Sequence, residues 1–96
     1  MAKAVLLYHD KADWPDGSIV EMTIWRLPMV SKERPHGLKY SLFFGRPDQR
    51  IIGYDNESGK GDHRHYGDVE QGYVFTDVET LIADFMADVR KERGDT

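Results

Sequence analysis

Residues 38–55 read LKYSLFFGRPDQRIIGYD, and this stretch decides the fold. Every second position in its first half is apolar, namely Tyr40, Leu42 and Phe44. That spacing is typical of a strand that buries one face. Residues 46–49 have the composition of a tight turn, because proline presets φ and aspartate favours turn conformations. Residues 50–55 then return as a second strand, so the stretch predicts an antiparallel hairpin.

Residues 18–27, upstream of this hairpin, alternate in the same way. Their apolar face consists of Val20, Met22 and Ile24. This pattern predicts a half-buried strand. A short first strand is predicted around Val5 and Leu7, followed by a turn at residues 14–17. Trp25 falls on the opposite face of its strand, where the indole either stacks on a nucleobase or covers that side of the sheet.

The last element predicted is a helix that begins near residue 76. Residues 76–79 fit a capping box, in which Thr76 and Glu79 satisfy two backbone donors. An apolar stripe at helical spacing follows: Val78, Leu81, Ile82, Phe85 and Val89. Cations occupy the last turn, where they suit the helix dipole, and Gly94 ends the helix.

Residues 63–66 and 73–75 are also able to form strands, but Gly67 and Gly72 leave their pairing open. We therefore predict an α+β fold, with a small antiparallel β-sheet of four to five strands. One C-terminal helix packs on one face of that sheet. The chain has 96 residues, so a single domain over residues 1–96 is expected.

The composition excludes several classes of protein. The chain contains no cysteine, which excludes a disulfide scaffold, a thiolate metal site and a thiol nucleophile. Its longest apolar run, residues 4–8, is far shorter than the roughly 20 residues of a membrane span. No signal-peptide pattern opens the chain, so no membrane association and a cytoplasmic location are expected. The net charge of -4 means that any RNA contact must come from locally clustered cations.

The most chemically reactive segment is GKGDHRH at residues 59–65. If it is extended, His63 and His65 point to the same face and Arg64 to the other. Two imidazoles on one face can act as general base and general acid in RNA cleavage, without a metal or a cofactor. We assign substrate binding to Lys60, Asp62 and Arg64, of which the two cations would stabilise charge on the phosphoryl group.

Other interpretations of this segment stay open. The histidines can be exposed residues without a catalytic role. Asp62, His63 and His65 can hold a metal ion, although neighbours on a strand point opposite ways and would not converge without a turn. Asp55, at the end of the preceding strand, is a further candidate for a catalytic carboxylate. In a non-enzymatic protein, the loop from Lys60 to Arg64 would dock nucleic acid or a partner, or the chain would serve as a subunit of a complex.

Several segments together show a pattern shared with a known family. They are DGSIVEM at 16–22, IWRLP at 24–28, KY with LFFG at 39–45, GYDNE at 53–57, GKGDHRH at 59–65 and LIADF at 81–85. With these segments, over residues 4–93, the chain resembles the TumE family of toxins. Members are small prokaryotic proteins of toxin–antitoxin pairs, and their usual partner is a helix-turn-helix antitoxin. The resemblance implies a toxin that a DNA-binding antitoxin neutralises, and it brings no catalytic residues with it.

Overall fold

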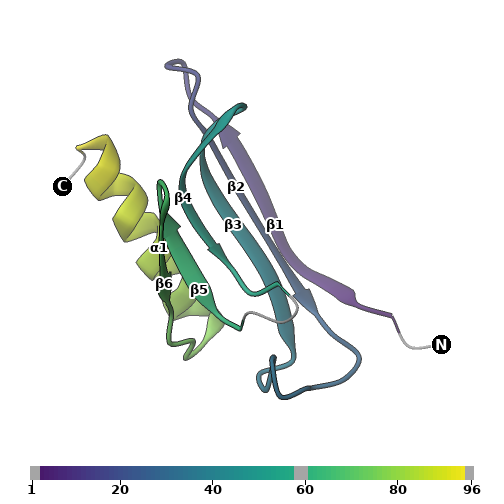
Figure 1. The fold of residues 1–96 in the computed structure, drawn as a ribbon. Helices are drawn as coiled ribbons and strands as arrows, with labels where there is room; N and C mark the ends of the chain where they lie inside the picture. Colours follow the sequence, from purple (N-terminus) through teal and green to yellow (C-terminus); the bar gives the residue numbers. More distant parts are fainter. Residues whose placement is uncertain (1–2, 58–60, 95–96) are drawn as a thin grey trace.

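The computed structural model describes residues 3–57 and 61–94, which form one antiparallel sheet of six strands followed by one helix (Figure 1). Each strand pairs with the next one along the chain, so the order in the sheet is the order in the sequence. The elements are β1 (Val5–Asp13), β2 (Ile19–Arg26), β3 (Leu38–Arg46), β4 (Gln49–Asp55), β5 (His63–Tyr66), β6 (Val69–Gly72) and α1 (Val78–Arg93).

The structure confirms the α+β fold, but the predicted count of four to five strands is wrong. The strand that the sequence did not indicate is β6, which follows a tight turn where Gly67 has a φ of 56°. All four residues of β6 are exposed, so it shows no alternation of apolar and polar side chains. Residues 73–75, which are able to form a strand by composition, lie outside the sheet.

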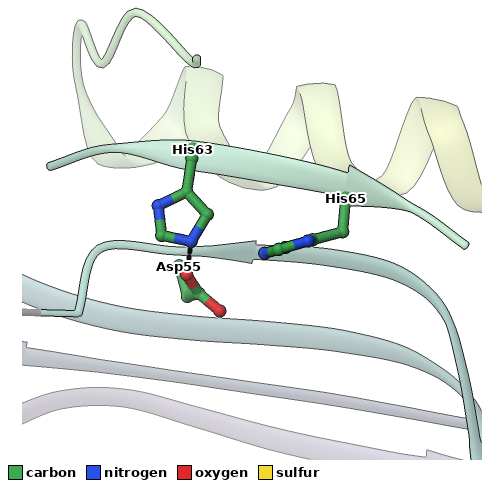
Figure 2. A group of neighbouring side chains, drawn as sticks. All are labelled: Asp55, His63 and His65. Atoms are coloured by element: carbon green, nitrogen blue, oxygen red, sulfur yellow. Dashed lines mark ion pairs between the residues drawn. The ribbon is translucent and has the colours of Figure 1, made fainter. Parts of the chain in front are cut away.

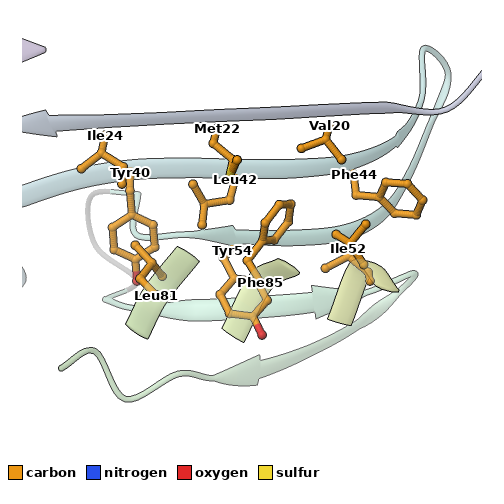
Figure 3. Close-up of a cluster of buried hydrophobic side chains, with 11 residues drawn as sticks. Val20, Met22, Ile24, Tyr40, Leu42, Phe44, Ile52, Tyr54, Leu81 and Phe85 are labelled. Carbon is orange, nitrogen blue, oxygen red and sulfur yellow. The ribbon is translucent and has the colours of Figure 1, made fainter. Parts of the chain in front are cut away.

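The core lies between one face of the sheet and α1 (Figure 3). The sheet contributes the predicted alternating positions of β2 and β3 together with two residues of β4. The buried apolar residues are Val20, Met22, Ile24, Tyr40, Leu42, Phe44, Ile52, Tyr54, Leu81, Phe85 and Val89. Phe85 meets the ring of Tyr54 edge-on, at a centroid distance of 5.6 Å. The helix therefore covers one face of the sheet and leaves the other without a helical layer.

Both ends of α1 are capped, although the N-terminal cap differs from the prediction. Asp77, rather than Thr76, is the N-cap, and its carboxylate accepts a hydrogen bond of 2.7 Å from the backbone N–H of Thr80. The predicted capping box is therefore out of register by one residue, because Thr and Asp are both good N-caps and stand side by side. At the other end Gly94 adopts a φ of 80°, which confirms the predicted stop.

The pairing of β4 with β5 decides which side chains share a face. Tyr54 lies opposite Arg64, and both belong to the face that α1 covers. Asp55 lies opposite His63, and Gly53 opposite His65, so these residues belong to the helix-free face. Within residues 3–57 and 61–94, no helix is long and apolar enough to cross a membrane.

Candidate functional site

Three side chains that can carry chemistry meet on the helix-free face. Asp55 ends β4, and His63 and His65 are the first and third residues of β5 (Figure 2). Their donor atoms all lie within 4.8 Å of one another. We call Asp55, His63 and His65 the Asp–His–His cluster.

The two histidines of the cluster are buried side by side. His63 is 5% exposed and His65 is 7% exposed. Their rings are 4.9 Å apart between centroids, at an interplanar angle of 79°. The interpretation of this pair as exposed surface residues is therefore wrong, while the prediction that both point to one face is confirmed.

Hydrogen bonding orients the ring of His63. Its Nδ1 donates to the backbone carbonyl of Gly61 over 3.0 Å, so Nδ1 carries a proton and Nε2 faces the cluster. That Nε2 forms an ion pair with Asp55 Oδ1. Asp55 Oδ1 is buried and meets no other hydrogen-bond donor in the part of the chain that the structure describes. The contact satisfies this oxygen only when Nε2 carries a proton, because a neutral ring with its proton on Nδ1 offers no donor there.

His65 lies in a mixed electrostatic environment. Burial lowers the pKa of its imidazole, and the positive charge of Arg50 lowers this pKa further. The negative charges of Asp55 and Glu70 act in the opposite direction. Glu70, across the strand pair on β6, has a carboxylate oxygen 3.7 Å from His65 Nε2.

Arg50 is a residue of this site that sequence reasoning missed. A Cβ added to Gly53 would lie 2.7 Å from Arg50 Cδ, which shows that the arginine side chain crosses over this glycine. Because Gly53 lies directly opposite His65, Arg50 places its charge over the cluster's face of the sheet. A glycine inside a strand often marks such a close approach, and Gly53 was the signal available in the sequence.

Arg64, predicted to bind substrate, lies on the other face of the sheet. Its guanidinium donates to the hydroxyl of Tyr54 over 3.3 Å and lies 3.8 Å from the carboxylate of Asp88 on α1. The Tyr54 hydroxyl also donates to Asp88. These contacts connect β5 and β4 to the helix, and they separate Arg64 from the histidines that flank it in sequence.

Asp62 also lies outside the cluster, and Lys60 lies outside the described residues. The Asp62 carboxylate accepts hydrogen bonds from the Tyr40 hydroxyl over 2.7 Å and from His36 Nε2 over 3.0 Å. The backbone N–H of Leu38 donates to His36 Nδ1, so the proton of the neutral ring is on Nε2. Asp62 thereby fixes the start of β5, and Asp55 is the carboxylate that meets His63 and His65.

Trp25 lies on the helix-free face, as predicted, but in a separate hollow. That hollow has a volume of about 350 Å³ and is lined by Ala4, Trp25, Leu27 and Lys39. Trp25 is half-buried, so both stacking on a nucleobase and covering this side of the sheet stay predictions.

Comparison with known proteins gives one result. A family model described as "Toxin TumE" matches residues 6–93, which is nearly the whole chain. No curated protein matches the chain, and no solved structure matches it.

Proposed function

We propose that this chain, which belongs to the TumE family of toxins, cleaves RNA with the Asp–His–His cluster. Membership of this family implies an antitoxin partner. The observation that supports the cluster as the reactive centre is the pair of buried imidazoles, whose ring centroids are 4.9 Å apart. Two imidazoles held this closely can transfer protons at both ends of one phosphodiester exchange.

The proposed reaction is an internal transfer at phosphorus. One histidine removes the proton of a ribose 2′-hydroxyl, and the 2′-oxygen forms a bond to phosphorus. The bond from phosphorus to the 5′-oxygen breaks, and the second histidine gives this oxygen a proton. The products are a 2′,3′-cyclic phosphate and a 5′-hydroxyl, and the chemistry needs no metal.

Local charges suggest the role of each ring. His63 forms an ion pair with Asp55, so we assign it as the acid. Burial and the nearby positive charge of Arg50 both favour a neutral ring at His65, so we assign it as the base. Arg50 is exposed and long, so it can swing aside from Gly53 to admit a phosphate and then stabilise its charge. Substrate binding by Lys60 stays a prediction.

The test uses purified protein, total RNA and transfer RNA, in the presence of a chelator. His63→Ala and His65→Ala are each expected to lower the cleavage rate by roughly 10²–10⁴-fold. His9→Ala is the matched control, because His9 lies in the same sheet but is exposed and paired with Glu21. Cleavage at the wild-type rate by the folded double variant would remove the cluster from the mechanism.

The partner proposed for this toxin is a helix-turn-helix antitoxin. Expression of the chain alone is expected to arrest growth, and co-expression with the antitoxin is expected to restore it. Expression of the His63→Ala, His65→Ala double variant should leave growth unaffected while the variant still binds the antitoxin. Growth arrest by this variant would show that toxicity does not depend on the cluster.

A further inference from the structure

We propose that the Asp–His–His cluster is also a binding site for one Zn²⁺ ion. The ligands are the carboxylate of Asp55 and one ring nitrogen from each of His63 and His65.

The strands bring a set of donors together that suits zinc. Residues two apart on β5 point to the same face, so the sequence His-Arg-His presents two imidazoles there. Asp55 lies directly opposite His63 on β4 and adds a carboxylate from the neighbouring strand. Two nitrogens and one oxygen form a zinc set with three protein ligands, which leaves a fourth position for water or another small ligand.

Two further observations point to a cation. The Nδ1–H of His63 is held by the carbonyl of Gly61, which turns the free electron pair of Nε2 toward the cluster when the ring is neutral. Metal-binding histidines nearly always have their other ring nitrogen held in this way. In addition, the buried Asp55 Oδ1 faces this Nε2 and has no donor among the described residues when the ring is neutral, and a metal ion between the two atoms would satisfy both.

The spacing fits after small movements of side chains. With bonds of about 2.0–2.1 Å, ligands at a tetrahedral ion are roughly 3.4 Å apart. The three donor atoms now lie within 4.8 Å of one another, so an adjustment of about an ångström is needed. His63 Nε2 and Asp55 Oδ1 must in turn move apart to admit the ion between them.

The charged groups around the cluster allow a divalent cation to bind. Asp55 and Glu70 supply negative charge, and among the described residues Arg50 and a protonated His63 oppose it at His65. Arg50 is an exposed side chain that lies over Gly53, so it can move into solvent when the ion binds. Burial of both imidazoles keeps bulk water from competing for the ion.

If the proposed function holds, zinc regulates it. A ring nitrogen bound to zinc can neither accept a proton nor donate one, so the ion and the proton transfers exclude each other. Zn²⁺ is therefore expected to inhibit cleavage, and a chelator is expected to restore it. The binding of zinc itself does not depend on the proposed function.

The test measures binding before activity. The full chain is treated with EDTA, dialysed and titrated with ZnCl₂ in a calorimeter, and with CoCl₂ while the visible absorption of the cobalt ion is recorded. We expect one ion per chain and the spectrum of a four- or five-coordinate cobalt site. His65→Ala and Asp55→Asn should each weaken binding by at least 10-fold, whereas His9→Ala should not.

Control measurements separate a real site from adventitious binding. Thermal melting of each variant shows whether it is folded, and Asp55→Asn keeps the shape of the side chain if Asp55→Ala does not fold. The absence of saturable binding would overturn the proposal. Binding that His65→Ala and Asp55→Asn leave unchanged would overturn it as well, because the ion would then lie elsewhere.

Activity assays on the same samples separate this inference from the proposed function. Zinc binding without RNA cleavage, in either the free or the loaded protein, supports the zinc site and contradicts the proposed function. Cleavage without zinc binding supports the proposed function and contradicts the zinc site. Cleavage that zinc stops and EDTA restores supports both, whereas cleavage that requires zinc supports the site and overturns its inhibitory role.

Discussion

At the scale of single residues, two glycines determine what the central hairpin can do. Gly45 faces the turn between β3 and β4 so closely that a Cβ would collide with the backbone carbonyl of Gln49. Gly53 leaves the space that the Arg50 side chain occupies beside His65. The first glycine therefore serves the fold, and the second shapes the helix-free face next to the cluster.

The substitution Gly53→Ala tests the position of Arg50. The new methyl group would lie 2.7 Å from Arg50 Cδ, and the flexible arginine should move rather than the backbone. We expect cleavage to fall by about 10-fold, the effect of one lost charged hydrogen bond, with little change in melting temperature. Gly72→Ala is the control, because a Cβ there meets nothing within 4 Å.

Arg50→Ala should give the same loss of cleavage as Gly53→Ala. If both variants cleave RNA as fast as the wild-type protein does, Arg50 has no part in the reaction.

At the scale of elements, the cap of α1 gives a direct comparison between two neighbouring residues. Asp77 holds the N–H of Thr80, while Thr76 precedes the cap. Asp77→Ala should lower the melting temperature by several degrees, because a backbone donor at the helix N-terminus loses its partner. Thr76→Ala should leave the melting temperature unchanged. A larger loss of melting temperature in Thr76→Ala than in Asp77→Ala would instead support the predicted capping box.

Tyrosine hydroxyls near α1 make the fold sensitive to alkaline pH. Burial raises the pKa of Tyr66 to about 12, and a hydrogen bond to Asp88 contributes to the shift. Burial also raises the pKa of Tyr54 and of Tyr73, which donate to Asp88 and Asp84. A tyrosine in the unfolded chain ionises near pH 10, so the unfolded state loses its protons first as the pH rises.

The contribution of these tyrosines to the free energy of unfolding should therefore be constant below about pH 10 and should fall between about pH 10 and pH 12. Urea denaturation at intervals across this range measures the effect, and phenolate absorbance reports the ionisation. Tyr66→Phe should make the fall less steep. A free energy of unfolding that stays constant up to pH 12 would contradict the hydrogen-bonded arrangement of these tyrosines.

The sequence predicted those elements whose side chains show a clear period. The hairpin of β3 and β4, the alternation of β2 and the apolar stripe of α1 were all visible, because each buries one face. β6 buries no side chain, so its sequence carries no such pattern.

Within the candidate site, the shared face of His63 and His65 followed from their spacing alone. Asp55 was only one candidate carboxylate among others, and Arg50 was missed, because their places beside the histidines depend on the register between β4 and β5. That register is set by long-range contacts, such as those of Asp62 with Tyr40 and His36, and a local pattern does not contain them.

At the scale of the whole molecule, α1 supplies one wall of the core. Leu81, Phe85 and Val89 are buried against β2, β3 and β4, and the molecule measures 43 × 24 × 24 Å. Phe85→Ala should lower the free energy of unfolding by about 3–5 kcal/mol, because it leaves a cavity at the centre of this wall. Urea denaturation measures the loss, and Val74→Ala, at a side chain that is 83% exposed, should have almost no effect.

The strictly sequential order of the strands has a consequence for synthesis on the ribosome. Each strand pairs with the one translated just before it, so hairpins can form as the chain emerges, and loops that must close are short. The core still lacks its second wall until residues 78–93 have left the exit tunnel. We expect a nascent chain to hold β4 and β5, and hence the Asp–His–His cluster, in loosely packed form until then. A cell that makes this toxin thus gains an interval, set by translation, in which an antitoxin can meet it before it becomes active.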